Sequence, residues 1–361
     1  MAARSPPEGV CYNGALWQTG ESRAPSMQGK TLRSPRSLVL LVLAVALGLG
    51  ALLVAGRDPA AQLTAFGTHF LAIFIEALPF LLLGALISGL LDSFVLPGDI
   101  ARLMPRNAVL AALLGAAIGL FFPVGECGVV PVARRLTIKG LPLQAGIAFL
   151  LAAPVINPIV LASTYAAFGF GPLLIGRFLL TGAVAVITGL IFALAARPQD
   201  ALRPDVLALT PPAGDPPPAE ARRLSFGPGL RHALTTAGRD FLVFGRYLLL
   251  GAVLAAAVQT LIPPEALTEH GGPLLPVLGL LALAFILSIS PLSDTTFALS
   301  LTGAIAPGSL LAFLILGPMV DLKSAVLFLG LYKPKAVVFL VIIPLLLIFW
   351  AGVWLNLNGA L

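Results

Sequence analysis

Polar side chains stand inside two otherwise apolar stretches of this chain, next to residues that break helices. The polar residues are Glu126, Cys127, Ser293 and Asp294. Their helix-breaking neighbours are Pro123, Gly125, Gly128 and Pro291. Where helices begin at such breaks, free N–H groups and the positive end of the helix dipole suit an anion, whereas carboxylates suit a proton or a cation. The alternative is that both acids only cap their own helices, and both interpretations stay open.

A second pair of polar residues, Asn157 and Asp321, follows two further breaks. The prolines beside them are Pro154, Pro158 and Pro318. Proline frees a carbonyl four residues earlier, and a side chain nearby could line the same cavity. For Asn157 the alternative is a structural hydrogen bond between helices. For Asp321 it is a solvated or paired structural role with Lys323, two residues away.

One more acid, Glu76, lies inside a hydrophobic segment beside Pro79. An internal match, given below, places Arg246 at the position that corresponds to Pro79. Glu76 and Arg246 therefore fall on comparable faces of two segments. A buried ion pair is costly unless it is well compensated, so a structural clamp and a proton relay are both open.

Metal and disulfide chemistry have no visible basis in this sequence. The two cysteines, Cys11 and Cys127, lie far apart, as do the three histidines, His69, His232 and His270. Such spacing makes neither a disulfide framework nor a zinc cluster, so we predict no metal site and no cofactor. Cys127 is either a buried inert thiol or a single ligand for a soft metalloid.

Composition identifies the solvent of this chain as lipid. Of 361 residues, 58% are hydrophobic and 11% are charged, with a mean hydropathy of +0.99. Soluble domains carry about 25% charged residues, so we predict an all-α polytopic protein whose partner is the lipid bilayer. The net charge of +6 does not predict nucleic-acid binding, because the basic residues flank hydrophobic spans. The sequence has no phosphate-binding GxxxxGK[ST] motif.

Hydrophobic runs and polar segments divide the chain into five predicted parts. They are a disordered cytoplasmic tail (1–36), an N-terminal span (37–65), a first repeat (66–196), a disordered cytoplasmic linker (197–231) and a second repeat (232–361). The tail and linker are too polar and proline-rich to build a core. For the run at 38–55 an uncleaved anchor is favoured over a signal peptide, since its charged lead is long and no clear cleavage site follows.

Within the repeats, long apolar runs predict membrane spans and shorter ones predict hairpins. The predicted spans are 69–91, 141–162, 172–195, 241–262, 309–331 and 335–355. The shorter pairs are 107–122 with 123–136, and 274–290 with 291–306. At 1.5 Å per residue each shorter segment falls below the roughly 30 Å hydrocarbon core, so each pair predicts a re-entrant hairpin.

Two internal matches relate the halves of the chain. PFLLLGALISG (79–89) matches RYLLLGAVLAA (246–256), and AFLLAAPVINP (148–158) matches AFLILGPMVDL (312–322). With the N-terminus inside and both pairs as hairpins, 19 of the 22 Lys and Arg residues are cytoplasmic, as positive-inside topology requires. The repeats then begin on opposite sides of the membrane. The prediction is two inverted repeats, each with a broken-helix hairpin, and one extra N-terminal span, the architecture of secondary transporters.

Four segments resemble the bacterial predicted-permease family that includes the organoarsenical efflux permeases (ArsP-like). They are ECGVVPVARRL (126–136), AFLLAAPVINP (148–158), SD (293–294) and GPMVDLK (317–323). The resemblance covers roughly 66–355. It implies a permease of the bacterial plasma membrane, multi-pass with a cytoplasmic N-terminus, exporting a small toxic solute such as a metalloid or organoarsenical. Family members commonly carry a second cysteine two residues before the one that matches Cys127. Here that position is Gly125, which weakens the case for arsenic held between two thiols.

Two other functions compete with transport. A membrane thiol-redox carrier would use Cys127, although such carriers normally need a reactive pair of thiols. A non-transporting membrane partner protein would tolerate loss of both tip acids. An enzyme is not predicted, because no HExxH, paired catalytic acids or Ser/His set is present.

Overall fold

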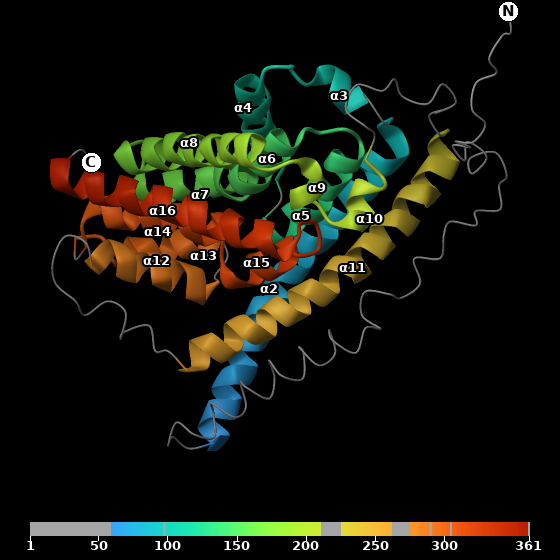
Figure 1. Ribbon diagram of the computed structural model, residues 1–361. Coiled ribbons are helices and arrows are strands. Elements are labelled where there is room, and N and C mark those ends of the chain that lie inside the picture. The colour runs from blue at the N-terminus through green and yellow to red at the C-terminus, as the bar shows by residue number, and fades with distance from the viewer. Residues whose placement is uncertain are drawn as a thin grey trace, which may run out of the picture. The chain divides into compact units, whose positions relative to one another are not determined.

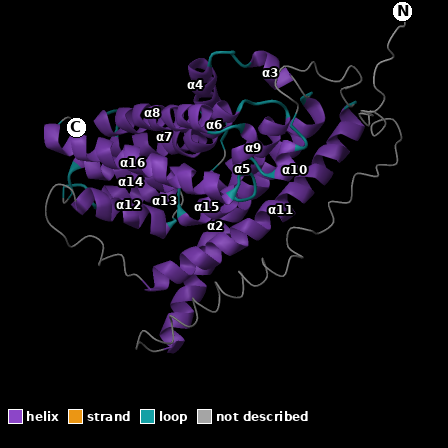
Figure 2. Ribbon diagram, viewed as in Figure 1, coloured by secondary structure: helices purple, strands orange, loops and turns teal. Residues whose placement is uncertain are grey.

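The structure is a computed structural model that describes residues 59–96, 99–123, 125–210, 225–261, 275–288, 291–303 and 305–359. The predicted tail and the run at 38–55 lie outside these residues. The described chain is helical throughout, and its only strand-like pairings are two isolated bridges (Figure 2). Six of its helical stretches are long and apolar enough to cross a membrane. This is a multi-pass membrane protein.

The described helices fall into a first and a second half, which a short linker segment joins (Figure 1). The first half has α2 (Pro59–Phe94), α3 (Asp99–Leu103), α4 (Ala108–Gly119), α5 (Glu126–Ile138), α6 (Leu143–Ile156), α7 (Pro158–Phe168) and α8 (Pro172–Ala195). The linker forms α9 (Pro198–Ala201) and α10 (Pro204–Leu207). The second half has α11 (Phe226–Leu261), α12 (Leu275–Leu287), α13 (Pro291–Ser300), α14 (Pro307–Met319), α15 (Leu322–Phe328) and α16 (Pro334–Asn358).

Helices α2 and α11 open the two halves and pack against each other (Figure 1). Each has 36 residues, so each is about 54 Å long and exceeds the hydrocarbon core. A Cβ on Gly89 of α2 would lie 2.1 Å from the carbonyl oxygen of Ala233, so the two backbones touch there. The predicted spans 69–91 and 241–262 lie inside these two helices, which extend beyond them. Helix α2 already begins at Pro59, inside the predicted N-terminal span, and α11 begins at Phe226, inside the predicted linker.

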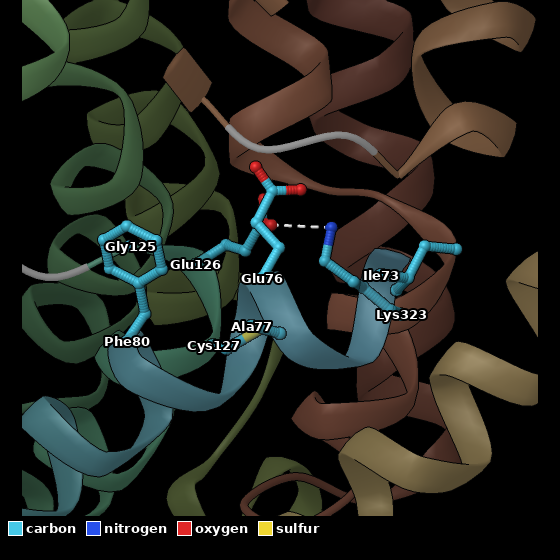
Figure 3. Close-up of a pocket in the computed structure, with 8 residues that line it drawn as sticks. All are labelled: Ile73, Glu76, Ala77, Phe80, Gly125, Glu126, Cys127 and Lys323. Atoms are coloured by element: carbon cyan, nitrogen blue, oxygen red, sulfur yellow. Dashed lines mark ion pairs between the residues drawn. The ribbon is translucent and has the colours of Figure 1, made fainter. Parts of the chain in front are cut away.

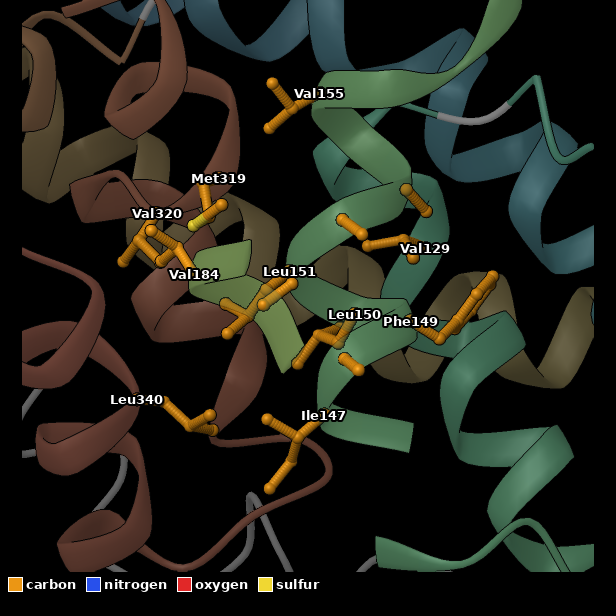
Figure 4. Packing of buried hydrophobic residues seen from close by; sticks show 14 of the residues in the cluster. Val129, Ile147, Phe149, Leu150, Leu151, Val155, Val184, Met319, Val320 and Leu340 are labelled. Atoms are coloured by element: carbon orange, nitrogen blue, oxygen red, sulfur yellow. The ribbon is translucent and has the colours of Figure 1, made fainter. Parts of the chain in front are cut away.

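Helices α6 and α14 are the most enclosed of the long apolar stretches and form the centre of the core. Figure 4 shows Leu151 of α6 together with Val184 of α8 and Met319 of α14. Both stretches, predicted as spans at 141–162 and 309–331, are long and apolar enough to cross a membrane, but neither is one continuous helix. Each stretch is broken in two, between α6 and α7 and between α14 and α15, because a polar residue caps a new helix at the break.

The linker predicted as disordered is helical at both ends of its length. Ala201, Leu202 and Val206 are buried in the main hydrophobic core, although prolines lie next to them in the sequence. The amide of Arg203 donates to the Leu331 carbonyl at 3.1 Å. The segment therefore belongs to the folded unit, and residues 211–224 lie outside the described chain.

The short pairs have the lengths expected of half-helices. Helices α4, α5, α12 and α13 contain 12, 13, 13 and 10 residues. Pro123 and Gly125 lie in the α4–α5 break, and Pro158 and Pro291 each begin a helix. Three other predicted breaks were wrong: Gly128, Pro154 and Pro318 lie inside helices. Helix α6 ends two residues after Pro154 and α14 ends one residue after Pro318, so each proline lies in the last turn before its break.

Candidate functional site

The first tip, at the start of α5, is held by close packing on α2. Gly125 is the N-cap of α5 in an extended conformation, and Glu126 is the first helical residue. A Cβ on Gly84 of α2 would lie 2.1 Å from the carbonyl oxygen of Gly128. Only glycine permits this approach, because any larger side chain would push the helices apart. The contact sets Glu126 and Cys127 beside α2, where Glu76 lies.

The Glu126 carboxylate pairs with a lysine from the other half of the chain. Lys323, in the first turn of α15, places its Nζ 2.6 Å from Glu126 Oε1 and 2.5 Å from Asp321 Oδ2. The same Nζ donates to the backbone carbonyl of Ser288 at 2.5 Å. Lys323 is 3% exposed and Glu126 is 5% exposed. Three oxygens from three helix ends thus surround one buried ammonium.

A small cavity of about 10 Å³ lies at this ion pair (Figure 3). Its lining is Ile73, Glu76, Ala77, Phe80, Gly125, Glu126, Cys127 and Lys323. A volume of this size holds about one water molecule. The second oxygen of Glu126, Oε2, is buried and has no hydrogen-bond partner. One carboxylate oxygen beside the cavity can therefore still accept a hydrogen bond. The thiol of Cys127, 2% exposed, lines the same space.

The second tip reaches the same region through Glu76. The Ser293 hydroxyl, near the start of α13, donates to Glu76 Oε1 at 3.3 Å. Residues from α2, α5, α13 and α15 therefore meet around the cavity. The predicted partner of Glu76 is elsewhere: Arg246 is exposed on α11, and the structure does not pair the two.

The second acid of the tips, Asp294, pairs with a buried arginine. Arg177 of α8 places Nη2 3.2 Å from Asp294 Oδ2, and the two side chains are 0% and 1% exposed. Arg177 Nη1 donates to the hydroxyls of Thr164 at 2.8 Å and Thr295 at 3.2 Å. The Thr295 hydroxyl in turn donates to Asp294 Oδ1 at 3.0 Å. This pair is sealed among α7, α8 and α13.

The two ion pairs are reciprocal between the halves of the chain. Glu126 belongs to the first half and is paired by Lys323 of the second. Asp294 belongs to the second half and is paired by Arg177 of the first. The local sequence singled out both acids, but it did not indicate which base pairs with each. Both bases carried a usable signal, since a charged residue inside an apolar segment is rare and needs a partner.

The two polar residues at the other breaks cap helices. Asn157 Oδ1 accepts a hydrogen bond from the Val160 amide at 2.9 Å and begins α7. Asp321 Oδ1 accepts from the Ser324 amide at 2.6 Å and begins α15. The Asn157 amide nitrogen donates to the carbonyls of Ala153 and Pro154, so these contacts are local to the α6–α7 break. Asp321 is paired, as one alternative held, but it is fully buried rather than solvated.

A separate charge network ties the far end of α5 to its neighbours. Arg135 lies 3.0 Å from both Asp92 of α2 and Asp240 of α11, and Arg134 lies 3.4 Å from Asp240. Lys139 follows α5 and lies 3.4 Å from Asp92. Burial lowers the pKa of the Lys139 ammonium, although Asp92 opposes the shift. These contacts join α5 to α2 and α11, so we assign them a structural role.

The described residues contain no group of three or more His, Cys, Asp or Glu side chains placed to hold a metal ion. Within the same part of the chain Cys127 is the one free cysteine. Cys11 lies outside it. The geometry therefore offers ion pairs, one thiol and a small polar cavity.

Comparison with known proteins gives one family and two curated relatives. Residues 62–357 match the family model ArsP_1, described as "Predicted permease". "UPF0718 protein YcgR" of Bacillus subtilis is 41% identical over 285 residues, covering 78% of this chain and 94% of the relative. The "Putative two-component membrane permease complex subunit" of Streptococcus mutans is 35% identical over 273 residues, covering 74% of this chain and 86% of the relative. No solved structure matches this chain.

Proposed function

Because this chain belongs to the predicted-permease family, we propose that it is a secondary transporter of the bacterial plasma membrane. The proposed cargo is a small toxic solute, such as a metalloid or an organoarsenical, and the proposed direction is export. The family supports a membrane permease rather than an enzyme. The cargo and the direction are inferred from the resemblance and from the site.

The observation that carries the proposal is the pair of reciprocal buried ion pairs at broken helices. Irregular backbone and charged side chains are tolerated in a membrane where they line a cavity or a solute pathway. Here both tip acids, Glu126 and Asp294, meet bases from the opposite half of the chain. In transporters with two repeats, the site lies near the bilayer midplane between the repeats. We propose that the pathway passes through the Glu126 cavity, where one carboxylate oxygen can still accept a hydrogen bond.

The same proposal includes the topology. The repeated order of helices and the equal lengths of α2 and α11 support two related halves. In the inverted arrangement, the α4–α5 and α12–α13 pairs enter from opposite leaflets. The basic residues around the end of α5 then face the cytoplasm, and so does the N-terminus.

Cys127 is the residue that favours a soft cargo. Its thiol lines the cavity beside Glu126 and can supply one sulfur ligand. Gly125 contributes no second thiol. The other bonds of a trivalent arsenic atom would therefore go to its own substituents or to oxygens of the cavity. The proposal therefore favours an organoarsenical, whose carbon substituent already occupies one bond, over inorganic arsenite.

The two rival functions make different demands on the same residues. A thiol-redox carrier needs a second thiol near Cys127, and the described residues supply none. A non-transporting subunit is suggested by the name of the Streptococcus mutans relative, which calls that protein part of a permease complex. Such a subunit would leave solute accumulation unchanged when expressed alone.

The test is a resistance and accumulation assay in an arsenic-sensitive bacterial host. Wild type, Glu126→Gln and Cys127→Ser are compared with Arg246→Gln, which removes an exposed charge, under trivalent organoarsenicals, arsenite and other oxyanions. Wild type and Arg246→Gln should lower accumulation, and Glu126→Gln should not. If Cys127→Ser keeps resistance, the thiol is not needed to bind the cargo, and the redox-carrier hypothesis is excluded as well. Equal accumulation in all four strains at matched membrane expression would refute the proposed cargo.

A further inference from the structure

The ammonium of Lys323 lies where a free cation would be coordinated. Its three oxygen partners are the carboxylates of Glu126 and Asp321 and the backbone carbonyl of Ser288, at 2.5–2.6 Å. Carboxylates and backbone carbonyls are the ligands that hard metal cations take in proteins. In transporters, unwound carbonyls and the C-terminal ends of half-helices coordinate the coupling ion.

The helix ends around Lys323 are arranged to attract a positive charge. Ser288 follows the last turn of α12, where the helix dipole is negative. It adopts a positive φ of 46°, a conformation that costs a residue with a side chain about 1–2 kcal/mol. Two earlier carbonyls of the same helix end, those of Ile286 and Leu287, accept hydrogen bonds from Gln259. The Ser288 carbonyl, by contrast, accepts a hydrogen bond from the Lys323 ammonium.

The carboxylates at this site carry more negative charge than the single positive charge of Lys323 can balance. Two buried carboxylates face one ammonium, and Glu76 lines the adjoining cavity. Glu126 Oε2 is buried without a partner. The site is therefore built for positive charge, and its backbone approaches closely, because a Cβ on Gly251 would lie 2.9 Å from the Lys323 Cα.

We propose that Lys323 is a tethered cation, whose ammonium fills a monovalent-cation site formed by the ends of α5, α12 and the α14–α15 break. A side chain that cannot leave replaces a Na⁺ or K⁺ ion at this position. One consequence rests on the proposed function: transport by this chain does not depend on a Na⁺ or K⁺ gradient. The binding statement itself stands without it.

The test measures thermal unfolding of the purified full chain in detergent, so its result does not depend on transport. Wild type and Lys323→Ala are compared in NaCl, KCl and N-methyl-D-glucamine chloride at one ionic strength. Wild type should give the same Tm in all three salts. Lys323→Ala should be less stable and should regain roughly 2–4 °C in NaCl or KCl, rising with the logarithm of the metal-ion concentration.

Two further variants separate a cation site from a general salt effect. Lys139→Ala removes a less deeply buried lysine whose partner, Asp92, keeps Arg135, so its Tm should not distinguish the salts. In Lys323→Ala combined with Asp321→Asn the gain in NaCl or KCl should disappear. A Na⁺- or K⁺-specific gain in wild type overturns the proposal. So does a Lys323→Ala protein that behaves alike in the three salts, or one that fails to fold in all of them.

Discussion

The two buried ion pairs differ in how many acids share one base. Lys323 faces two carboxylates, Glu126 and Asp321, beside a cavity. Arg177 pairs with one carboxylate, Asp294, and donates its other hydrogen bonds to the neutral hydroxyls of two threonines. If one carboxylate is neutralised, Lys323 therefore keeps a charged partner, whereas Arg177 does not. This difference agrees with a proposed pathway at the first site and a structural role for the second.

The largest expected effect comes from removing the arginine. Arg177→Met leaves Asp294 charged, buried and unpaired, which typically costs about 3–5 kcal/mol. We expect a low yield of folded protein and a strongly reduced Tm in detergent. The double variant with Asp294→Leu should recover much of the loss, because no charge is then buried. If Arg177→Met were as stable as wild type, the locking role would be wrong.

The next effect is the difference between the two acids themselves. Asp294→Asn strands the Arg177 guanidinium and should cost about 3–5 kcal/mol. Glu126→Gln should cost only about 1–3 kcal/mol, because Lys323 keeps Asp321 and an amide oxygen can still accept a hydrogen bond. Thermal unfolding of both variants measures the gap. Equal losses would show that the two sites share one role.

Packing of the first tip provides the third prediction. Gly84→Ala forces a methyl group onto the Gly128 carbonyl and should cost about 1–3 kcal/mol by displacing α5. Gly245→Ala on α11 meets nothing within 4 Å and serves as the matched control. A Gly84→Ala protein with the Tm of the control would mean that α5 moves freely, and the close contact would then not position Glu126.

The smallest effect is expected at the cap of α7, the helix that carries Thr164 to Arg177. Asn157→Ala removes the acceptor for the Val160 amide and should cost about 1 kcal/mol. Asp321→Ala should cost more, since Asp321 both caps α15 and pairs with Lys323. Thermal unfolding in matched detergent compares them. The reverse order would place the critical break in the first half of the chain.

The sequence alone predicted the fold class, several helices and the family of this protein. Hydropathy depends on composition over a window, and it predicted a multi-pass helical protein and α8 at its observed bounds. Prolines and polar residues in apolar runs predicted the short helices α4, α5, α12 and α13 and drew attention to Asn157 and Asp321. Family membership followed from local motifs, which need no knowledge of packing.

What only the tertiary structure decided is which charges meet. Asp294 and Arg177 lie 117 positions apart, and no local pattern joins them. The partner of Glu126 depends on α5 seated on α2 and α15 seated on α11, which the glycines at 84 and 251 permit. The helical ends of the linker were missed for the same reason, since Leu202 and Val206 are buried by helices distant in sequence. Local sequence determines which segments become helices, and contacts between helices determine which buried charge each acid receives.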